Sequence, residues 1–176
     1  GFLPNMPETV ISMLATASLG AVWTSCSPDF GVQGVLDRFG QVKPKIFICV
    51  DGYYYNGKEF DCLEKNKKIV SQLPSLKNTL LVRFVNNSSE FLDLSQSFFF
   101  DEIISKPTNT DIEFESVAFN DPLYILFSSG TTGVPKCIVH SVGGTLIQHK
   151  KEHMLHCDIK DGDRVFFFST CGWMMW

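Results

Sequence analysis

The chain has 176 residues, of which 44% are hydrophobic and 19% charged, and its formal net charge is −4 at pH 7. This share of apolar side chains argues against intrinsic disorder, because burying them can offset the entropy lost on folding. The acidic balance, with no run of Lys and Arg, argues against nucleic acid as a partner, since no basic cluster is available to displace counterions. The length favours one domain or part of one.

Helices and strands are predicted to alternate along the chain. The first helix is expected over 7–19, because apolar residues recur at helical spacing and Gly20 is a stop signal. Further helices are predicted over 32–42, 60–73 and 145–156. Strands are predicted over 21–26, 45–50, 79–85, 123–127, 137–140 and 164–169, where β-branched and aromatic residues are frequent. The segment 86–120 is less regular. This alternation predicts an α/β fold made of βαβ units with a mostly parallel sheet.

The six cysteines are scattered, with no C-x-x-C pair and no metal-finger spacing. Most lie in apolar runs, where cysteine is ordinarily a small buried hydrophobe, so a reducing compartment, the cytosol, is expected. No apolar stretch approaches the length of about 18 residues that crosses a bilayer, so no membrane span is expected. The chain opens on Gly1 and closes on the apolar cluster 173–176, which favours a piece of a longer protein.

The most informative segment is a predicted strand at 123–127 followed by a loop of small hydroxyl residues, glycines and a terminal lysine. Its candidate ligands for the phosphates of ATP are Ser128, Ser129, Gly130, Thr131, Thr132, Gly133 and Lys136. Glycines let backbone N–H groups approach phosphate oxygens closely, hydroxyls donate further hydrogen bonds, and a lysine neutralises charge. The alternative is a Ser- and Gly-rich turn with no ligand. The number of specified positions directly after a strand favours the phosphate site.

This segment resembles the phosphate-binding loop of the adenylate-forming enzymes, a family that includes acyl-CoA synthetases and luciferases. Further resemblance to the family's N-terminal domain lies at 4–8, 19–21, 139–141 and 143–144. At finer grain, the segments 27–31, 35–39, 55–59 and 172–176 are similar to the branch of the family that activates acetoacetate. The resemblance covers nearly the whole chain. The loop indicates the family, and the flanking segments indicate the branch.

The resemblance implies that 1–176 is an incomplete AMP-binding (adenylation) domain, a fragment of the large N-terminal domain of an acyl-CoA synthetase. It implies a two-step ligation in which ATP and acetoacetate give an acyl-adenylate and pyrophosphate, and coenzyme A then displaces AMP. The Mg²⁺-binding glutamate, the ribose-binding aspartate and the catalytic lysine of the mobile C-terminal domain are implied to lie beyond Trp176. The isolated chain is therefore expected to complete neither half-reaction.

Two further sets of residues are assigned from the same resemblance. Trp173, Met174 and Met175 fall where related synthetases line the acyl pocket or thioester channel, although plain core packing is equally compatible with such a cluster. Asn56, Gly57 and Lys58 fall where related enzymes contact the nucleotide of coenzyme A, and a solvated turn is the simpler interpretation.

Other functions remain open from the sequence. The stretch from Gly52 to Lys58 nearly spells the P-loop NTPase signature, but Glu59 stands where that signature has the Mg²⁺-binding Ser or Thr. A non-catalytic nucleotide-binding module would carry the same loop as an active synthetase.

The chain has four histidines, each a candidate functional residue. His149, His153 and His156 share a helical face that could bind zinc, opposite an apolar face, but surrounding charges favour a solvated surface. His140 is interpreted as a hydrogen-bonded structural histidine rather than a catalytic base.

Overall fold

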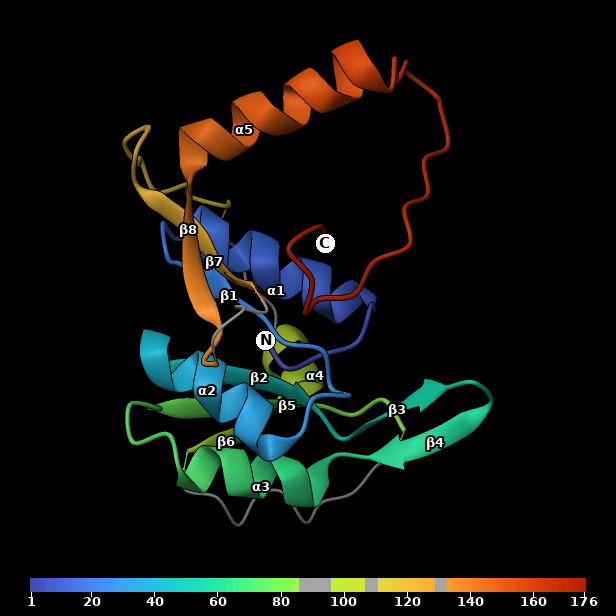
Figure 1. Cartoon of the computed structure of the whole chain (residues 1–176). Coiled ribbons are helices and arrows are strands. Elements are labelled where there is room, and N and C mark those ends of the chain that lie inside the picture. The colour runs from blue at the N-terminus through green and yellow to red at the C-terminus, as the bar shows by residue number, and fades with distance from the viewer. Residues whose placement is uncertain (86–95, 107–110, 129–132) are drawn as a thin grey trace.

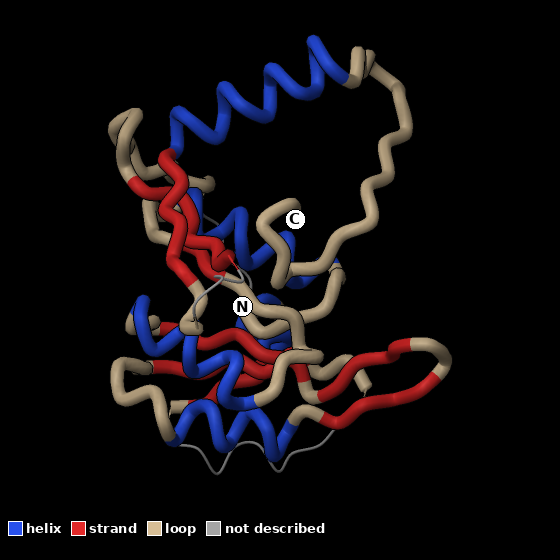
Figure 2. The backbone as a smooth tube through the Cα atoms, viewed as in Figure 1, coloured by secondary structure: helices blue, strands red, loops and turns tan. Residues whose placement is uncertain are grey.

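Strands and helices alternate along the computed structural model, which describes all residues except 86–95, 107–110 and 129–132 (Figures 1 and 2), so the predicted α/β class is confirmed. The strands are β1 (Trp23–Thr24), β2 (Ile46–Val50), β3 (Gly52–Tyr55), β4 (Lys58–Asp61), β5 (Asn78–Val82), β6 (Ser97–Phe99), β7 (Pro122–Ser128) and β8 (Lys136–Ser141). The helices are α1 (Pro7–Ser18), α2 (Val32–Val42), α3 (Leu63–Ser71), α4 (Phe100–Ile104) and α5 (Val142–Lys151), and α5 continues into a π-helical turn, η2 (Glu152–His156).

The described strands form two three-stranded sheets and a separate hairpin. The sheet orders are β1-β7-β8 and β2-β5-β6, and β3 pairs with β4. The β1–β7, β2–β5 and β5–β6 pairs are parallel, whereas β7–β8 and β3–β4 are antiparallel. Phe2 forms parallel bridges to both Cys26 and Cys49, so this one residue connects the two larger sheets into a mostly parallel array.

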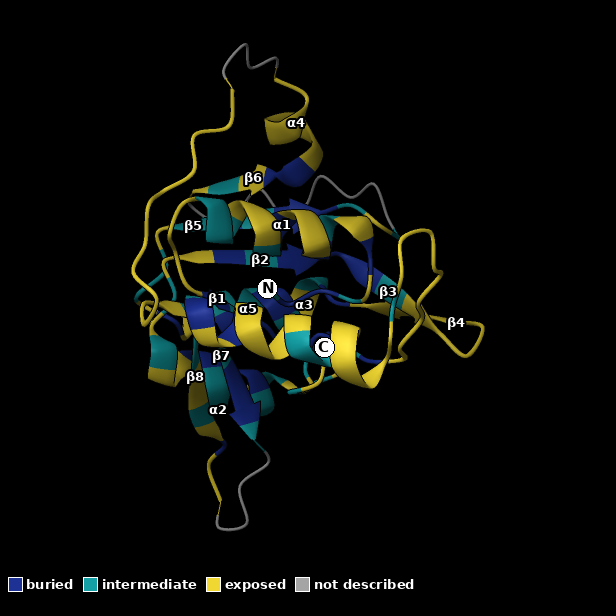
Figure 3. Cartoon of the chain, turned by 90° about the horizontal axis from the view of Figure 1, so that it is seen from above, coloured by how far each residue is buried: buried dark blue, intermediate teal, exposed yellow. Residues whose placement is uncertain are grey.

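The helices cover these sheets unevenly (Figure 1). α2 and α3 pack against each other, and α3 contacts β2. α1 contacts β1, while α5 contacts β7 and β8. Figure 3 shows that much of α5 is exposed, and its apolar residues Leu146 and Ile147 are 66% and 59% exposed. The apolar face of this helix, expected opposite its histidines, is therefore exposed to solvent rather than buried.

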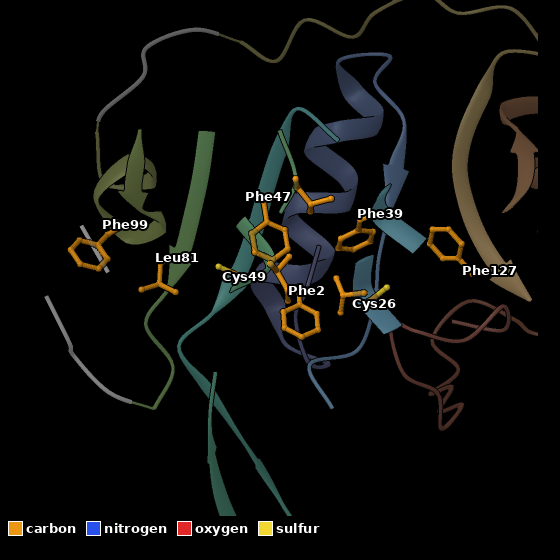
Figure 4. Packing of buried hydrophobic residues seen from close by; sticks show 11 residues of the cluster. Phe2, Cys26, Phe39, Phe47, Cys49, Leu81, Phe99 and Phe127 are labelled. Carbon is orange, nitrogen blue, oxygen red and sulfur yellow. The ribbon is translucent and has the colours of Figure 1, made fainter. Parts of the chain in front are cut away.

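A core of aromatic side chains joins the two larger sheets (Figure 4). Phe2 stacks on Phe47 with ring centroids 6.1 Å apart, and Phe39 of α2 meets Phe47 edge-on at 6.2 Å. Phe39 also contacts Phe127 of β7 at 6.5 Å. Full burial of such a side chain stabilises a fold by about 1.5–3 kcal/mol. Phe39 therefore fixes α2 against β2 and against the end of β7.

The prediction that most cysteines are buried hydrophobes is confirmed. Cys26, Cys49, Cys62 and Cys171 are buried, and Cys157 is exposed. Burial raises the pKa of Cys26 to about 12 and those of Cys62 and Cys171 to about 11, because an ionised thiolate would be desolvated. These thiols therefore stay protonated in the folded protein at neutral pH.

The predicted start of α3 and the predicted end of β5 are wrong for identifiable reasons. The helix expected from Phe60 begins at Leu63, because residues up to Asp61 are paired in the β3–β4 hairpin. The strand expected to reach Val85 ends at Val82, because the buried carboxylate of Asp51 accepts hydrogen bonds from the backbone N–H groups of Phe84 and Val85, at 2.8 and 3.0 Å.

The last predicted strand, over 164–169, does not form. Its residues have no strand partner within the described residues, and Phe166 is 87% exposed. A strand needs a neighbouring ladder to satisfy its backbone groups, so strand propensity alone does not make one. The helix predicted over 145–156 begins earlier, at Val142, because the Ser141 hydroxyl caps it by accepting from the Gly144 N–H at 3.2 Å.

Candidate functional site

The predicted phosphate loop joins the antiparallel strands β7 and β8. Their register places Ser128, the last residue of β7, opposite Lys136, the first residue of β8. Gly133 has φ = +119°, a backbone conformation that favours glycine, and Lys136 is exposed. The predicted ligands Ser129, Gly130, Thr131 and Thr132 lie outside the described residues.

The β7 end of this loop is anchored in the core. Phe127, directly before Ser128, is only 6% exposed and packs on Phe39. The guanidinium of Arg38 lies 4.6 Å from the ring centroid of Phe30 and 5.9 Å from that of Phe127. A cation over two aromatic faces stabilises this arrangement modestly. The position of Ser128 therefore depends on side chains of α2.

The β8 end is also held by α2. The side-chain amide of Gln41 donates to the carbonyl oxygen of buried Pro135 at 2.9 Å and to that of Asp37 at 2.6 Å. Sequence reasoning missed Arg38 and Gln41, because nothing local indicates that a helix so far back along the chain contacts this loop. The available signals were that both lie on the helix predicted over 32–42 and that Arg38 falls in the segment 35–39, which resembles the family branch.

The geometry at the described ends of the loop fits an anion site. A hydroxyl residue and an ammonium residue occupy opposite positions of one strand pair, and α2 contacts the residue next to each of them. An exposed lysine held at its backbone can neutralise phosphate charge as a point cation. Burial raises the pKa of the adjacent Cys137 thiol, so this thiol adds no negative charge beside the lysine at neutral pH.

The rival P-loop interpretation is wrong. Gly52 to Lys58 form a tight hairpin rather than a loop between a strand and a helix, and Glu59 lies within β4. Asn56 and Gly57 form its two-residue turn with φ of 48° and 72°, the positive values that such hairpin turns require. The hairpin projects from the body of the protein (Figure 1), with Lys58 exposed and paired to Tyr55.

The C-terminal segment lies against the start of the chain. The Trp176 indole N–H donates to Asn5 Oδ1 at 2.7 Å, and the Asn5 amide donates to the Ser169 carbonyl. Trp176 also lines an apolar cavity of about 290 Å³ between α1, β1, β7 and α5. Trp173, Met174 and Met175 are not among the residues lining this cavity, and Trp173 and Met175 are exposed. Their assignment to an acyl pocket stays a prediction.

The histidines differ in their surroundings. His140 stacks on Tyr124 with ring centroids 4.9 Å apart, and its buried Nε2 has no hydrogen-bond partner among the described residues. Within that part of the chain, Nε2 therefore does not make the expected hydrogen bond. The His149 and His153 rings lie 6.3 Å apart. In the parts of the chain that the structure describes, no group of three or more His, Cys, Asp or Glu residues could hold a metal.

The three candidate regions lie in different parts of the fold. The loop belongs to the β1-β7-β8 sheet, the hairpin is a sheet of its own, and the C-terminal segment contacts Asn5. Among the residues that the structure describes, no helix is long and apolar enough to span a membrane.

Comparison with known proteins identifies the family. A family model described as AMP-binding enzyme matches residues 2–176. The chain is 54% identical to acetoacetyl-coenzyme A synthetase from Rhizobium meliloti (strain 1021), with 99% of this chain and 27% of that protein covered. It is 50% identical to acetoacetyl-CoA synthetase from Macaca fascicularis, with 100% of this chain and 27% of that protein covered.

A solved structure gives the same result. Acetoacetyl-CoA synthetase from Streptomyces lividans matches with a TM-score of 0.92 and 43% identity, over 100% of this chain and 26% of that chain. The chain thus spans about a quarter of the length of the relatives it matches. Because the family model covers almost every residue, including both described ends of the predicted phosphate loop, the chain belongs to the AMP-binding enzyme family.

Proposed function

We propose that this chain forms part of the adenylation domain of a longer acid–CoA ligase that converts acetoacetate, ATP and coenzyme A into acetoacetyl-CoA, AMP and pyrophosphate. Membership of the AMP-binding family supports the reaction class. The similarity to acetoacetyl-CoA synthetases along the whole chain supports acetoacetate as the acid. The observation that carries the proposal is the register that pairs Ser128 with Lys136 at the two ends of the loop.

The proposed reaction has two displacement steps. A carboxylate oxygen of the acid attacks the α-phosphorus of ATP, a new O–P bond forms, and the bond to pyrophosphate breaks. The coenzyme A sulfur, having lost its proton, then attacks the acyl carbon, and the C–O bond to AMP breaks. A carboxylate is a poor electrophile, so adenylation supplies the leaving group. Catalysis of such steps depends mostly on positioning and on neutralising phosphate charge.

We assign the loop to the β- and γ-phosphates of ATP and to the departing pyrophosphate. Ser128 and Lys136 bracket it, and Gly133 supplies a positive φ close to Lys136. Ser129, Gly130, Thr131 and Thr132 would add backbone and hydroxyl donors, as the family resemblance implies. Mg²⁺ would neutralise triphosphate charge when bound. No cluster of three or more metal-binding side chains occurs in the described ranges, so we propose no Mg²⁺ ligand there.

Two further sets of residues are assigned to the other two substrates. We propose Trp173, Met174 and Met175 for the acyl pocket or thioester channel, on the family resemblance alone. We propose Asn56, Gly57 and Lys58 for the coenzyme A nucleotide, because the exposed hairpin turn presents a lysine that a phosphate could reach. We also propose a cytosolic location, which the free cysteines support.

The direct test is acid-dependent exchange of pyrophosphate into ATP by the full-length protein, comparing acetoacetate with acetate and longer acids. The proposal predicts exchange that requires an acid and is fastest with acetoacetate. Exchange that is fastest with another acid would contradict the choice of substrate. Absence of exchange with every acid would contradict the ligase assignment.

A further inference from the structure

We propose that Gln41 is a positioning residue for Lys136: its amide fixes the carbonyl of Pro135 and thereby the backbone from which the phosphate-binding lysine starts. This inference rests on the proposed function, because it assumes that Lys136 contacts ATP. Gln41 lies in the last turn of α2, far from the loop along the chain.

The hydrogen bonds of Gln41 leave one orientation for its amide. Both neighbouring oxygens, those of Asp37 and Pro135, are carbonyls that can only accept, at 2.6 and 2.9 Å. The amide nitrogen has two N–H groups and can donate one to each. One N–H therefore ties the side chain to its own helix, and the other ties the helix to the residue preceding Lys136.

The helix that carries Gln41 is a rigid base for this contact. Val35 and Phe39 of α2 are 0% and 1% exposed, so the helix is fixed in the core. Lys43 ends it in the left-handed conformation, with φ of 50° and its N–H donating to the Phe39 carbonyl at 3.0 Å. Because α2 is fixed in the core, its hydrogen bond from Gln41 holds the Pro135 carbonyl at a fixed distance from the core.

The segment next to Pro135 has little other support on its loop side. Val134 is 63% exposed, and a Cβ added to Gly133 would meet nothing within 4 Å. The lysine ammonium group sits on a flexible side chain, so the side chain alone does not fix the position of the charge. The backbone anchor at Pro135 therefore limits where the ammonium group of Lys136 can reach, and its loss should weaken contacts with ATP more than contacts with the acid.

Gln41 is exposed, so its removal should affect the loop more than the stability of the fold. Two substitutions remove the donor nitrogen. Gln41→Leu does so at similar size and without a charge, whereas Gln41→Glu keeps the shape but adds a carboxylate whose charge repels ATP, so the Leu variant is the decisive one. Gln33→Leu is the matched control, because Gln33 lies on the same helix and its amide donates to Asp37 Oδ1 at 2.7 Å, within α2.

The test measures acid-dependent pyrophosphate exchange and thermal unfolding of the full-length protein. For both Gln41 variants we expect the KM for ATP to rise about two- to tenfold, the range that loss of one hydrogen bond gives. The KM for the acid and the unfolding temperature should stay near those of the unchanged protein, and Gln33→Leu should alter neither KM.

The outcomes separate the two claims. An unchanged KM for ATP in the Gln41→Leu variant overturns the positioning role and leaves the proposed function intact. A drop in unfolding temperature with equal losses for ATP and acid also overturns it, because that pattern indicates a general structural role. Absence of exchange in the unchanged protein overturns the proposed function, and the positioning role with it.

Discussion

Ser128 and Lys136 face each other across β7 and β8, so the loop between them begins and ends at one strand spacing. In an antiparallel pair this spacing is about 4.5–5.5 Å between Cα atoms. A residue with a hydroxyl group and a residue with an ammonium group therefore stand at the two ends of the loop. One helix, α2, contacts both ends of the loop. Phe39 packs on Phe127 beside Ser128, and Gln41 donates a hydrogen bond to Pro135 beside Lys136.

The cysteines should differ sharply in reactivity. Cys157 is exposed, whereas Cys26, Cys49, Cys62 and Cys171 are buried. Burial raises the pKa of these four thiols, so they lack both access and thiolate character. We expect iodoacetamide at pH 8 to modify Cys157 in the native protein and the buried four only after denaturation. Peptide mapping by mass spectrometry would check this, and early modification of Cys49 would contradict it.

The same thiols predict a loss of stability in alkali. Their pKa values are about 11 to 12 for Cys26, Cys62 and Cys171, against 9.0 for an ordinary thiol. Above about pH 9 the unfolded chain releases these protons while the folded chain keeps them, so the unfolded state gains stability as pH rises. The free energy of unfolding should therefore fall between pH 9 and pH 12, measured by urea denaturation. Replacing Cys62 by Ala should reduce this dependence.

The turn of the β3–β4 hairpin should need its glycine. Gly57 has φ of +72°, which is strained for a residue with a Cβ, although no atom lies within 4 Å of the added Cβ. Gly57→Ala should lower the unfolding temperature through backbone strain alone. Gly40→Ala is the control: Gly40 lies inside α2 with equally open space, and the substitution should raise stability by about 0.5–1 kcal/mol. Equal effects of the two substitutions would contradict this reasoning.

His140 should be dispensable for the chemistry. Its ring stacks on Tyr124, and its buried Nε2 has no partner among the described residues. His140→Phe keeps the ring contact and removes the unsatisfied polar atom, whose burial costs about 1–3 kcal/mol. We expect acid-dependent pyrophosphate exchange to persist with an unchanged pH profile. Loss of exchange with retained folding would instead identify His140 as a catalytic group.

Much of the fold could be predicted from local patterns. α2 occupies the predicted residues, because the spacing of Val35 and Phe39 and the Lys43-Pro44 pair after it define both its buried face and its end. β7 was also predicted nearly in full, because the segment from Leu123 to Phe127 is an unbroken run of apolar and aromatic residues. The parallel pairing of β2 with β5 follows from the intervening helix, as the alternation of elements predicted.

The remaining features depend on contacts that no local pattern encodes. The early end of β5 follows from the carboxylate of Asp51, which takes the next backbone N–H groups. The segment around Phe166 has strand-forming residues but no neighbouring strand among the described residues. The anchor from Gln41 to Pro135 joins residues that are distant in sequence, so it could only be found in three dimensions.

The most direct test of the account replaces three of the proposed phosphate ligands in the full-length protein. Thr131, Thr132 and Lys136 are each changed to Ala, and the KM for ATP and the rate of acid-dependent pyrophosphate exchange are measured beside the unchanged protein. If the loop binds the triphosphate, the triple variant should lose exchange by about a hundredfold or more, as loss of charge-stabilising donors does elsewhere, while it still folds. A triple variant that activates acetoacetate at the undiminished rate would contradict the assignment of the loop to ATP.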